Sequence, residues 1–476
     1  MNARALVPLF VLLLVGYFIY DQYQRGRVAL PGLPSQPTTS PNTSQPTSPS
    51  SPTPPAGAQN LEIEPGLFAA KPEQRQVFEL LAKKDYATVI TTADAWQRRN
   101  PTDALVGLAR ENAIAELGNS SMYTLGVSAP LTGPLKQVGE AFLQGVLLAV
   151  REVNNNGGVT VLGETNRITI RVLNDAGDRA TAIKVASAFA SDKLIWGVVG
   201  PYSSSTLLAA APIYNNSDRP VIAPAATNPR ISQAGQMIFR VAPSDSTQGA
   251  SLARLVKAKG YNSVAVLFDE NDAYSSGLAD SFKREAAQIK LTTSDTPFTL
   301  SNYDSAKVGN YGVQAIFVSG YTNDVAAVAK LEKGFGKPIF AGDGAYGQDL
   351  LAQGGDAVAG VIVTSFWHST LSDPNSKRFT ARFSELFGGG TPNANAVQAY
   401  DAARTLIEAL RRAKTLKSSE DVRRSLETFR TTPGPGVTAP VRFDANGDVV
   451  GRPWVAIQVQ RNPSGKLRFQ AIGYAK

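Results

Sequence analysis

Hydroxyl side chains gather where a predicted strand of this 476-residue chain gives way to a helix. The segment GPYSSST at 200–206 places three serines and a threonine in succession. Backbone N–H groups at a helix start attract anions, and hydroxyls beside them add donors, so this segment suits a carboxylate. Serine and threonine also cap helices without binding any ligand. The sequence leaves both interpretations open.

Three further loops follow predicted strands and could complete such a site. They are SAPLTGPLKQVGE at 128–140, APAATNP at 223–229, which contains Thr227, and AGDGAYG at 341–347, which contains Asp343. Glycines on both sides of Asp343 are also what a plain turn would need. A zwitterion requires an acidic group at one end and anion-binding donors at the other, because buried charges must be paired.

This chain lacks several residues that enzymes commonly use for catalysis. There is no cysteine and a single histidine, His368, which excludes thiolate nucleophiles, disulfides and Cys- or His-rich metal sites. We find no phosphate-binding P-loop and no Ser-His-Asp arrangement. The run from Asp444 to Asp448 begins like a calcium loop but lacks its bidentate Glu, so we expect a hairpin turn at Asn446-Gly447. We therefore predict no enzyme, no cofactor and no metal.

The bulk composition is that of a globular protein. Hydrophobic residues make up 43% and charged residues 18% of the chain. The net charge of +8 comes from 47 basic and 39 acidic residues, without a dense Lys/Arg run. We expect no nucleic-acid partner.

Apolar strands alternate with amphipathic helices from residue 122 onward. The predicted strands are Tyr123–Ser128, Ile168–Asn174, Gly197–Gly200, Val221–Ala223, Ser263–Phe268, Ala315–Ser319, Pro338–Ala341 and Gly360–Thr364. The predicted helices include Glu140–Asn154, Thr181–Ser191, Ser205–Tyr214 and Leu278–Gln288. Such alternation predicts an α/β protein with parallel sheets covered on both faces. Sheets of this kind bind ligands at the carboxyl ends of their strands, where the four loops lie.

The sequence of the N-terminal 60 residues predicts a membrane anchor and a linker rather than a folded domain. Residues 5–20 are apolar and end in tyrosines that are typical of a membrane interface. No small-residue cleavage pattern follows, so we favour an uncleaved anchor within 1–30 over a cleaved signal peptide. Residues 31–60 are rich in Pro, Ser and Thr, which predicts a disordered linker.

Residues 61–121 predict a short helical segment. Apolar residues from Phe78 to Trp96 fall near a 3.6-residue spacing, and the turn at 100–103 begins a new helix. The stretch KKDYATVITTADAWQRRNPTDALVGLAREN resembles a tetratricopeptide-like helical hairpin. A stalk or cap on the next domain is one interpretation, and a protein-binding site is the other.

Several phrases, taken in order, resemble the branched-chain amino-acid-binding proteins of ABC importers. They are SAPLTG, GPYSSSTLLAAAPIY, RPVIAPAATNP, FRVAPSDSTQG, NDAYSSGLADSF, FAGDGAYG and AVQAYDA. The resemblance implies a two-lobed type I periplasmic-binding-protein fold over 122–476, with parallel sheets flanked by helices and three crossover strands. It places lobe 1 at about 122–243 and 367–437, and lobe 2 at about 244–366 and 438–476.

The resemblance also implies roles for loop residues of the first lobe. Ser204 matches a serine that holds the ligand carboxylate, and Thr227 matches a threonine that shares this task. Ala225 matches a position whose backbone carbonyl meets the ligand ammonium. Val138 stands where several relatives have an aromatic residue, so the identity of the ligand side chain stays open.

Three residues of the second lobe receive roles in the same way. Tyr274 and Tyr321 match tyrosines that close over the ligand, and Asp343 matches an acidic residue that pairs with the ammonium. Binding would then bridge the lobes and favour closure. Trp367 and His368 either line the space between the lobes or cover a hinge.

We therefore predict an extracytoplasmic solute-binding protein that captures an amino acid or a related amine-bearing ligand and presents it to an ABC permease. The alternative is a membrane-tethered ligand sensor or scaffold that uses the same clamp without transport. The expected location is the periplasmic side of the bacterial inner membrane, held by an N-terminal helix, or the periplasm itself if that segment is cleaved.

Overall fold

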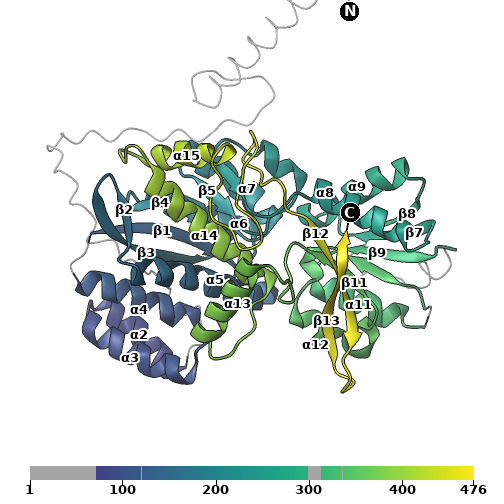
Figure 1. Cartoon of the computed structure of the whole chain (residues 1–476), viewed down its shortest axis with the longest axis horizontal. Helices are drawn as coiled ribbons and strands as arrows, with labels where there is room; N and C mark the ends of the chain where they lie inside the picture. Colours follow the sequence, from purple (N-terminus) through teal and green to yellow (C-terminus); the bar gives the residue numbers. More distant parts are fainter. Residues whose placement is uncertain (1–70, 119–120, 298–311, 335, 476) are drawn as a thin grey trace, which may run out of the picture. The chain divides into compact units, whose positions relative to one another are not determined.

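Two sheets organise the protein. The computed structural model describes residues 71–118, 121–297, 312–334 and 336–475. A six-stranded sheet has the order β2-β3-β1-β4-β5-β6, and a seven-stranded sheet has the order β13-β12-β11-β10-β9-β7-β8. We name the parts built on them lobe 1 and lobe 2 (Figure 1). The predicted two-lobed α/β fold is confirmed.

The predicted anchor (1–30), the predicted linker (31–60) and the start of the predicted helical segment lie outside the described residues. Within the described ranges, no helix combines the length and the apolar character needed to cross a membrane.

Lobe 1 has a mainly parallel sheet between helices. Its strands are β1 (Met122–Ala129), β2 (Val159–Val161), β3 (Glu164–Asn174), β4 (Ile195–Val199), β5 (Val221–Ala223) and β6 (Ile238–Arg240). Its helices are α5 (Lys136–Asn155), α6 (Arg179–Ser191), α7 (Ser204–Asn216), α13 (Pro374–Leu386), α14 (Ala394–Arg412) and α15 (Ser419–Glu427). Strand β1 pairs in parallel with both β3 and β4. It is buried along almost its whole length, as expected for a parallel strand covered on both faces.

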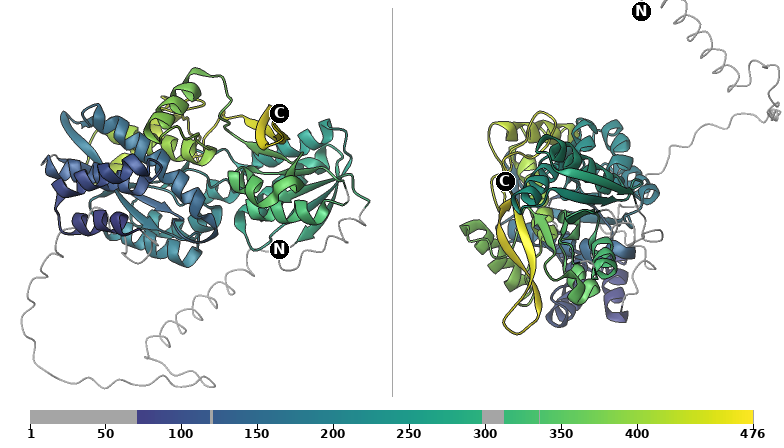
Figure 2. Two further views of the ribbon diagram at one scale, coloured as in Figure 1. Left: turned by 90° about the horizontal axis from the view of Figure 1, so that it is seen from below. Right: turned by 90° about the vertical axis from the view of Figure 1, so that its right-hand side faces the viewer.

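Lobe 2 repeats the pattern and ends in an antiparallel hairpin. Its strands are β7 (Ser263–Phe268), β8 (Thr292–Pro297), β9 (Ala315–Ser319), β10 (Ile339–Ala341), β11 (Ile362–Ser365), β12 (Trp454–Arg461) and β13 (Leu467–Ala475). Its helices are α8 (Asp245–Ala258), α9 (Ala273–Gln288), α11 (Thr322–Glu332) and α12 (Gln348–Gly354). Alternate residues of β9 enter the hydrophobic clusters on opposite faces of the sheet. The C-terminal hairpin β12–β13 forms one edge of the seven-stranded sheet (yellow in Figure 2).

Three helices precede lobe 1 and pack on it: α2 (Pro72–Ala82), α3 (Tyr86–Arg99) and α4 (Ala104–Leu117). Trp96 and Leu105 belong to the same buried cluster as Leu147 of α5 and Ile170 of β3. Figure 1 shows these helices beside α5. The helices therefore extend the core of lobe 1, which fits the interpretation as a cap. Their likeness to a tetratricopeptide hairpin stays a prediction.

One polar side chain joins this helical segment to the sheet. The amide of Asn112 donates to the Ile170 carbonyl over 2.8 Å and accepts from the Ile170 N–H over 3.0 Å. Asn154 of α5 makes the same pair of bonds with Ile168. Both asparagines are buried. They satisfy backbone groups of β3 that would otherwise be buried without partners.

Three connections run between the lobes, at 241–244, 366–373 and 431–453. Arg452 contacts all three. From the third connection it donates to the Val241 carbonyl over 3.1 Å, and its guanidinium lies 5.8 Å from the Phe366 ring centroid. It also pairs with Asp401 of α14 over 2.7 Å, and both side chains are fully buried. Burial raises the pKa of Asp401, while Arg452 opposes that rise.

The residues Trp367 and His368 lie on the second connection. Trp367 is fully buried and donates to Ser376 of α13 over 3.1 Å. His368 packs near Tyr346, with 5.9 Å between ring centroids, and burial lowers its pKa. These contacts favour the hinge interpretation over the ligand-lining one. The expected hairpin turn at Asn446-Gly447 is also present, between the bridged residues 443 and 449.

We expect Asn112→Ala to lower the free energy of unfolding by about 2 kcal/mol, because it leaves the N–H and the carbonyl of Ile170 buried without partners. Urea denaturation followed by tryptophan fluorescence measures the change. The matched control is Asn155→Ala at an exposed position near the end of α5. Equal losses in the two variants would contradict the role assigned to Asn112.

Candidate functional site

The carboxyl end of β4 leads into the start of α7, where the hydroxyl residues gather. Ser203 caps the helix by accepting from the Thr206 N–H over 3.2 Å. Ser204 is buried, and its oxygen accepts from the Asn228 N–H over 3.1 Å. The Ser204 hydroxyl therefore keeps its own proton to donate. Ser203 therefore accounts for the capping interpretation, whereas the Ser204 hydroxyl is left able to donate.

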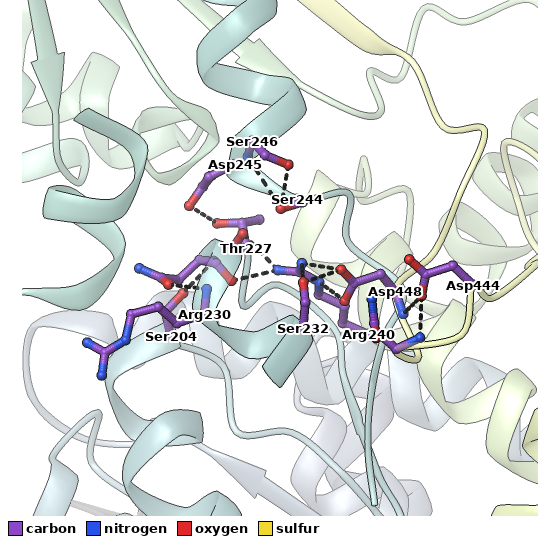
Figure 3. A network of polar contacts seen from close by, with 12 residues as sticks. Ser204, Thr227, Arg230, Ser232, Arg240, Ser244, Asp245, Ser246, Asp444 and Asp448 are labelled. Carbon is purple, nitrogen blue, oxygen red and sulfur yellow. Dashed lines mark hydrogen bonds and ion pairs between the residues drawn. The ribbon is translucent and has the colours of Figure 1, made fainter. Parts of the chain in front are cut away.

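Thr227 lies buried in the turn after β5 and contacts the first residue of α8. Its hydroxyl donates to a carboxylate oxygen of Asp245 over 3.0 Å (Figure 3). The Asp245 N–H donates in return to the Thr227 carbonyl over 2.8 Å. Because the hydroxyl proton points to Asp245, the lone pairs of the Thr227 oxygen are left to accept a hydrogen bond. The sequence did not single out Asp245, although it lies in the quoted phrase FRVAPSDSTQG.

Arg240 of β6 donates hydrogen bonds to the backbone of this turn. Its fully buried guanidinium donates to the carbonyls of Thr227 and Asn228 over 2.8 and 2.9 Å. On its other side it forms two bonds of 2.7 Å with the carboxylate of Asp448, on the third connection (Figure 3). A bidentate Arg–carboxylate pair fixes both distance and angle. The turn that contains Thr227 is thereby tied to the third connection between the lobes.

Asp343 follows β10 and forms the centre of the lobe 2 part of the site. One of its carboxylate oxygens accepts from the Tyr274 hydroxyl over 3.0 Å and from the Gln248 amide over 3.0 Å. The Tyr274 hydroxyl in turn accepts from the Gly344 N–H over 2.8 Å. A Cβ at Gly342 or Gly344 would lie within 2.6 or 2.7 Å of Tyr274. These glycines therefore make room for the tyrosine as well as a turn.

Two more tyrosines surround this group. Tyr321 of lobe 2 lies against Tyr274, with 5.2 Å between ring centroids. Tyr202, in the hydroxyl segment of lobe 1, is buried, and both its burial and the charge of Asp343 raise its pKa. Burial and nearby carboxylates likewise raise the pKa values of Tyr274 and Tyr321. All three phenols therefore stay protonated, and that of Tyr274 donates to Asp343.

The site contains two acidic side chains that repel each other. Burial raises the pKa of Asp245 well above the ordinary carboxyl value, and Asp343 raises it further, while Thr227 and Arg240 oppose the shift. Burial also raises the pKa of Asp343, against the bonds from Gln248 and Tyr274. One oxygen of Asp245 and the amide oxygen of Gln248 are buried without a partner among the described residues. The site thus offers more acceptors than donors on this side, which suits a cation.

Direct contacts join the two lobes beside these residues. The Ser205 hydroxyl of α7 donates to Asp272 over 2.8 Å and accepts from the Ala273 N–H over 3.0 Å. The Asn228 side chain donates to the Ala273 carbonyl. A Cβ at Gly277 would lie 2.1 Å from the Asn228 amide nitrogen, so this glycine allows the close approach. The lobes therefore meet through the start of α7 and the start of α9.

The structure brings most of the predicted site residues into contact networks. Tyr274, Tyr321 and Asp343 contact one another or a shared neighbour. Ser204 and Thr227 meet around Asn228. Ala225 is half-buried in the same turn, and Val138 is half-buried in α5. The sequence missed Tyr202, Asp245, Gln248 and Asp272, which lie inside phrases or beside residues that were noticed for other reasons.

Comparison with known proteins gives a consistent result. A model of a periplasmic binding protein family matches residues 123–466. A Leu/Ile/Val-binding protein homolog 2 of Brucella abortus is 28% identical over 371 residues, which is 75% of this chain and 96% of that protein. A leucine-, isoleucine-, valine-, threonine- and alanine-binding protein of Pseudomonas aeruginosa is 25% identical, over 73% of this chain and 94% of that protein.

Among solved structures, a leucine-binding protein LivK of Thermotoga maritima superimposes with a TM-score of 0.66 at 27% identity. The match covers 73% of this chain and 97% of that chain. The helices α2, α3 and α4 precede the residues that the family model matches. The matched family is one of solute-binding proteins and is not a class of enzymes.

We expect the melting temperature of the ligand-free wild type to fall relative to that of Asp245→Asn as pH rises above about 4, the ordinary value for a carboxyl group. The folded protein holds a proton on Asp245 more tightly than the unfolded chain does, so this stabilisation is complete below the ordinary pKa. It is lost as pH rises through the raised pKa. Asp245→Asn should flatten the pH profile and raise the melting temperature at pH 8 by about 2 °C or more.

The control for this experiment is Asp280→Asn, at a side chain that is 58% exposed. Its pH profile should follow the wild type. A profile of Asp245→Asn that is as steep as the wild type would show that Asp245 is not the titrating group.

Proposed function

Since the chain belongs to the periplasmic binding protein family, we propose that it is an extracytoplasmic receptor for an amino acid or a related amine-bearing solute. It captures the ligand between its lobes and presents it to an ABC permease. The relatives named for leucine, isoleucine and valine binding support this ligand class. No catalytic step is part of the proposal.

The carboxylate end of the ligand binds at the start of α7. Ser204 accepts from Asn228 and therefore donates its own proton to the ligand. The N–H groups of the first turn of a helix have no intrahelical partners, and the helix dipole favours an anion there. Tyr202 stands in the same segment as a protonated phenol. These groups are all donors, as a carboxylate requires.

The ammonium end binds on the acceptor side. Asp343 supplies the negative charge, and the Thr227 oxygen supplies lone pairs because its proton is donated to Asp245. The arrangement favours an ammonium contact for Thr227 over the carboxylate contact that the resemblance implies. The Ala225 carbonyl, in the same turn, completes the acceptors. Hydrogen bonds to charged groups are worth about 1.5–3 kcal/mol each.

The observation that carries the proposal is the separation of donors from acceptors. Ser204 and Asp343 come from different lobes, so a zwitterion that engages both favours the closed arrangement. The contacts of Ser205 with Asp272 and Ala273 add to closure without touching the ligand. Tyr274 and Tyr321 then cover the ligand from lobe 2.

For the location we propose the periplasmic side of the bacterial inner membrane. The family is one of periplasmic binding proteins. Anchoring by residues 1–30, with residues 31–60 as a linker, is supported by the apolar run and by the Pro/Ser/Thr composition. A cleaved signal would release the same domain into the periplasm.

A second candidate function is a tethered ligand sensor or scaffold. The helices α2–α4 favour it, because they precede the family match and pack into the core of lobe 1. Uptake of radiolabelled ligand by cells separates the two functions. A receptor for transport requires this chain for uptake, whereas a sensor leaves uptake unchanged when the gene is removed.

We expect amino acids to raise the melting temperature in a panel that also contains amides and urea. With a ligand identified, Asp343→Ala should weaken its binding by about tenfold or more, because one charge-assisted bond is lost. The deaminated analogue of the same ligand, such as 4-methylpentanoate for leucine, should lose far less. Isothermal titration calorimetry measures both affinities.

The control is Asp349→Ala in α12, an acidic residue outside the site. Equal losses for the amine and its deaminated analogue would remove Asp343 from the ammonium role. A panel without any stabilising ligand would count against the receptor and favour the scaffold.

A further inference from the structure

A cavity lies on lobe 1, outside the candidate amino-acid site. Its volume is about 330 Å³, and it opens between α13, α14, the end of α5 and the segment 434–440. Three arginines line it: Arg378 and Arg382, one turn apart on α13, and Arg404 on α14. This concentration of guanidinium groups has no part in the proposed amino-acid site.

The negative charge around this cavity is too small to balance the arginines. Glu152 is the one acidic side chain that lines it. Glu152 already accepts from Arg382 over 3.0 Å and from the Tyr400 hydroxyl over 2.7 Å. Burial and Glu152 raise the pKa of Tyr400, so its phenol stays protonated and keeps this bond.

The side chains of Arg378 and Arg404 form no ion pair with a described residue. Each is a planar fork of N–H donors, the geometry that matches carboxylate and phosphate oxygens. Their two charges face one open cavity, next to the amide of Asn375. A doubly charged anion would neutralise both.

The wall of the cavity is apolar. Phe379 and Tyr400 pack edge to face, with 5.1 Å between ring centroids, and Pro435, Val437 and Pro440 complete the lining. Phe379 and Val437 are themselves buried, so Tyr400, Pro435 and Pro440 supply the exposed part of this wall. A ligand with a charged end and an apolar or aromatic body would use both parts.

From this geometry we propose that the cavity is an anion site for a phosphate monoester, held by Arg378 and Arg404 with its organic part on Tyr400, Pro435 and Pro440. The phosphate group can belong to a free small molecule or to a lipid headgroup, because the chemistry that binds it is the same. The site is separate from the amino-acid site and does not depend on the function proposed there.

The test is calorimetric titration of the full chain with phenyl phosphate and, separately, with inorganic phosphate at pH 7.5. Phenyl phosphate should bind, and more tightly than inorganic phosphate. Arg378→Gln with Arg404→Gln should weaken it by about tenfold or more, the loss expected for charge-assisted bonds. Sedimentation with phosphatidylcholine vesicles that contain phosphatidic acid forms the second arm. Binding to these vesicles that the double variant loses, without binding of phenyl phosphate, assigns the site to a lipid headgroup.

Two controls keep the result specific. Arg75→Gln with Arg468→Gln removes two other exposed arginines and should leave binding unchanged. Asp343→Ala should also leave phenyl phosphate binding unchanged, since it alters the other site. The proposal fails if neither phenyl phosphate nor the vesicles bind, or if the Arg378/Arg404 variant binds them as the wild type does.

Discussion

The buried ion pair between Arg452 and Asp401 is the constraint on which the arrangement of this protein depends. Both side chains are fully buried, and the guanidinium reaches the Val241 carbonyl and the Phe366 ring as well. Removing one partner of such a pair costs about 3–5 kcal/mol, because the other charge stays buried. The pair lies where the three connections meet lobe 1, since Arg452 reaches two of them from the third. Arg240 and Asp448 form a further ion pair, beside the turn that contains Thr227.

Much of the fold was predictable because it depends on periodic patterns. The strand predicted at 315–319 occurs with those bounds, and the one at 123–128 gains a single residue at each end. The strands β2, β6 and β8 and the antiparallel β12–β13 hairpin were not predicted; a hairpin breaks the βα alternation on which the prediction rested. The helical segment was predicted as helices. Its packing on lobe 1 agrees with the cap interpretation, whereas the burial of the polar residues Asn112 and Glu111 was not predicted, because tertiary contacts bury them.

Candidate site residues could be predicted where the residue type and its sequence neighbours indicate a chemical role. Asp343, flanked by glycines, and Ser204, within a hydroxyl run, stood out in this way. Asp245 and Gln248 did not, because their roles come from the direction of hydrogen bonds. A threonine in a sequence can donate or accept, and its contact with Asp245 is what fixes Thr227 as an acceptor. Whether a hydroxyl donates or accepts depends on its partner in the fold, and the sequence does not identify that partner.

The contact between Asn112 and Ile170 has a mechanical consequence. The helical segment is fastened to the β3 edge of lobe 1 by paired amide bonds and a shared apolar core. A pulling force applied at Lys71 would therefore enter lobe 1 directly and would not be transmitted across the hinge. In the proposed clamp, a load at the N-terminal end of the described residues therefore bears on lobe 1 and leaves lobe 2 to move. Opening and closing of the proposed clamp are then movements of lobe 2 measured against lobe 1.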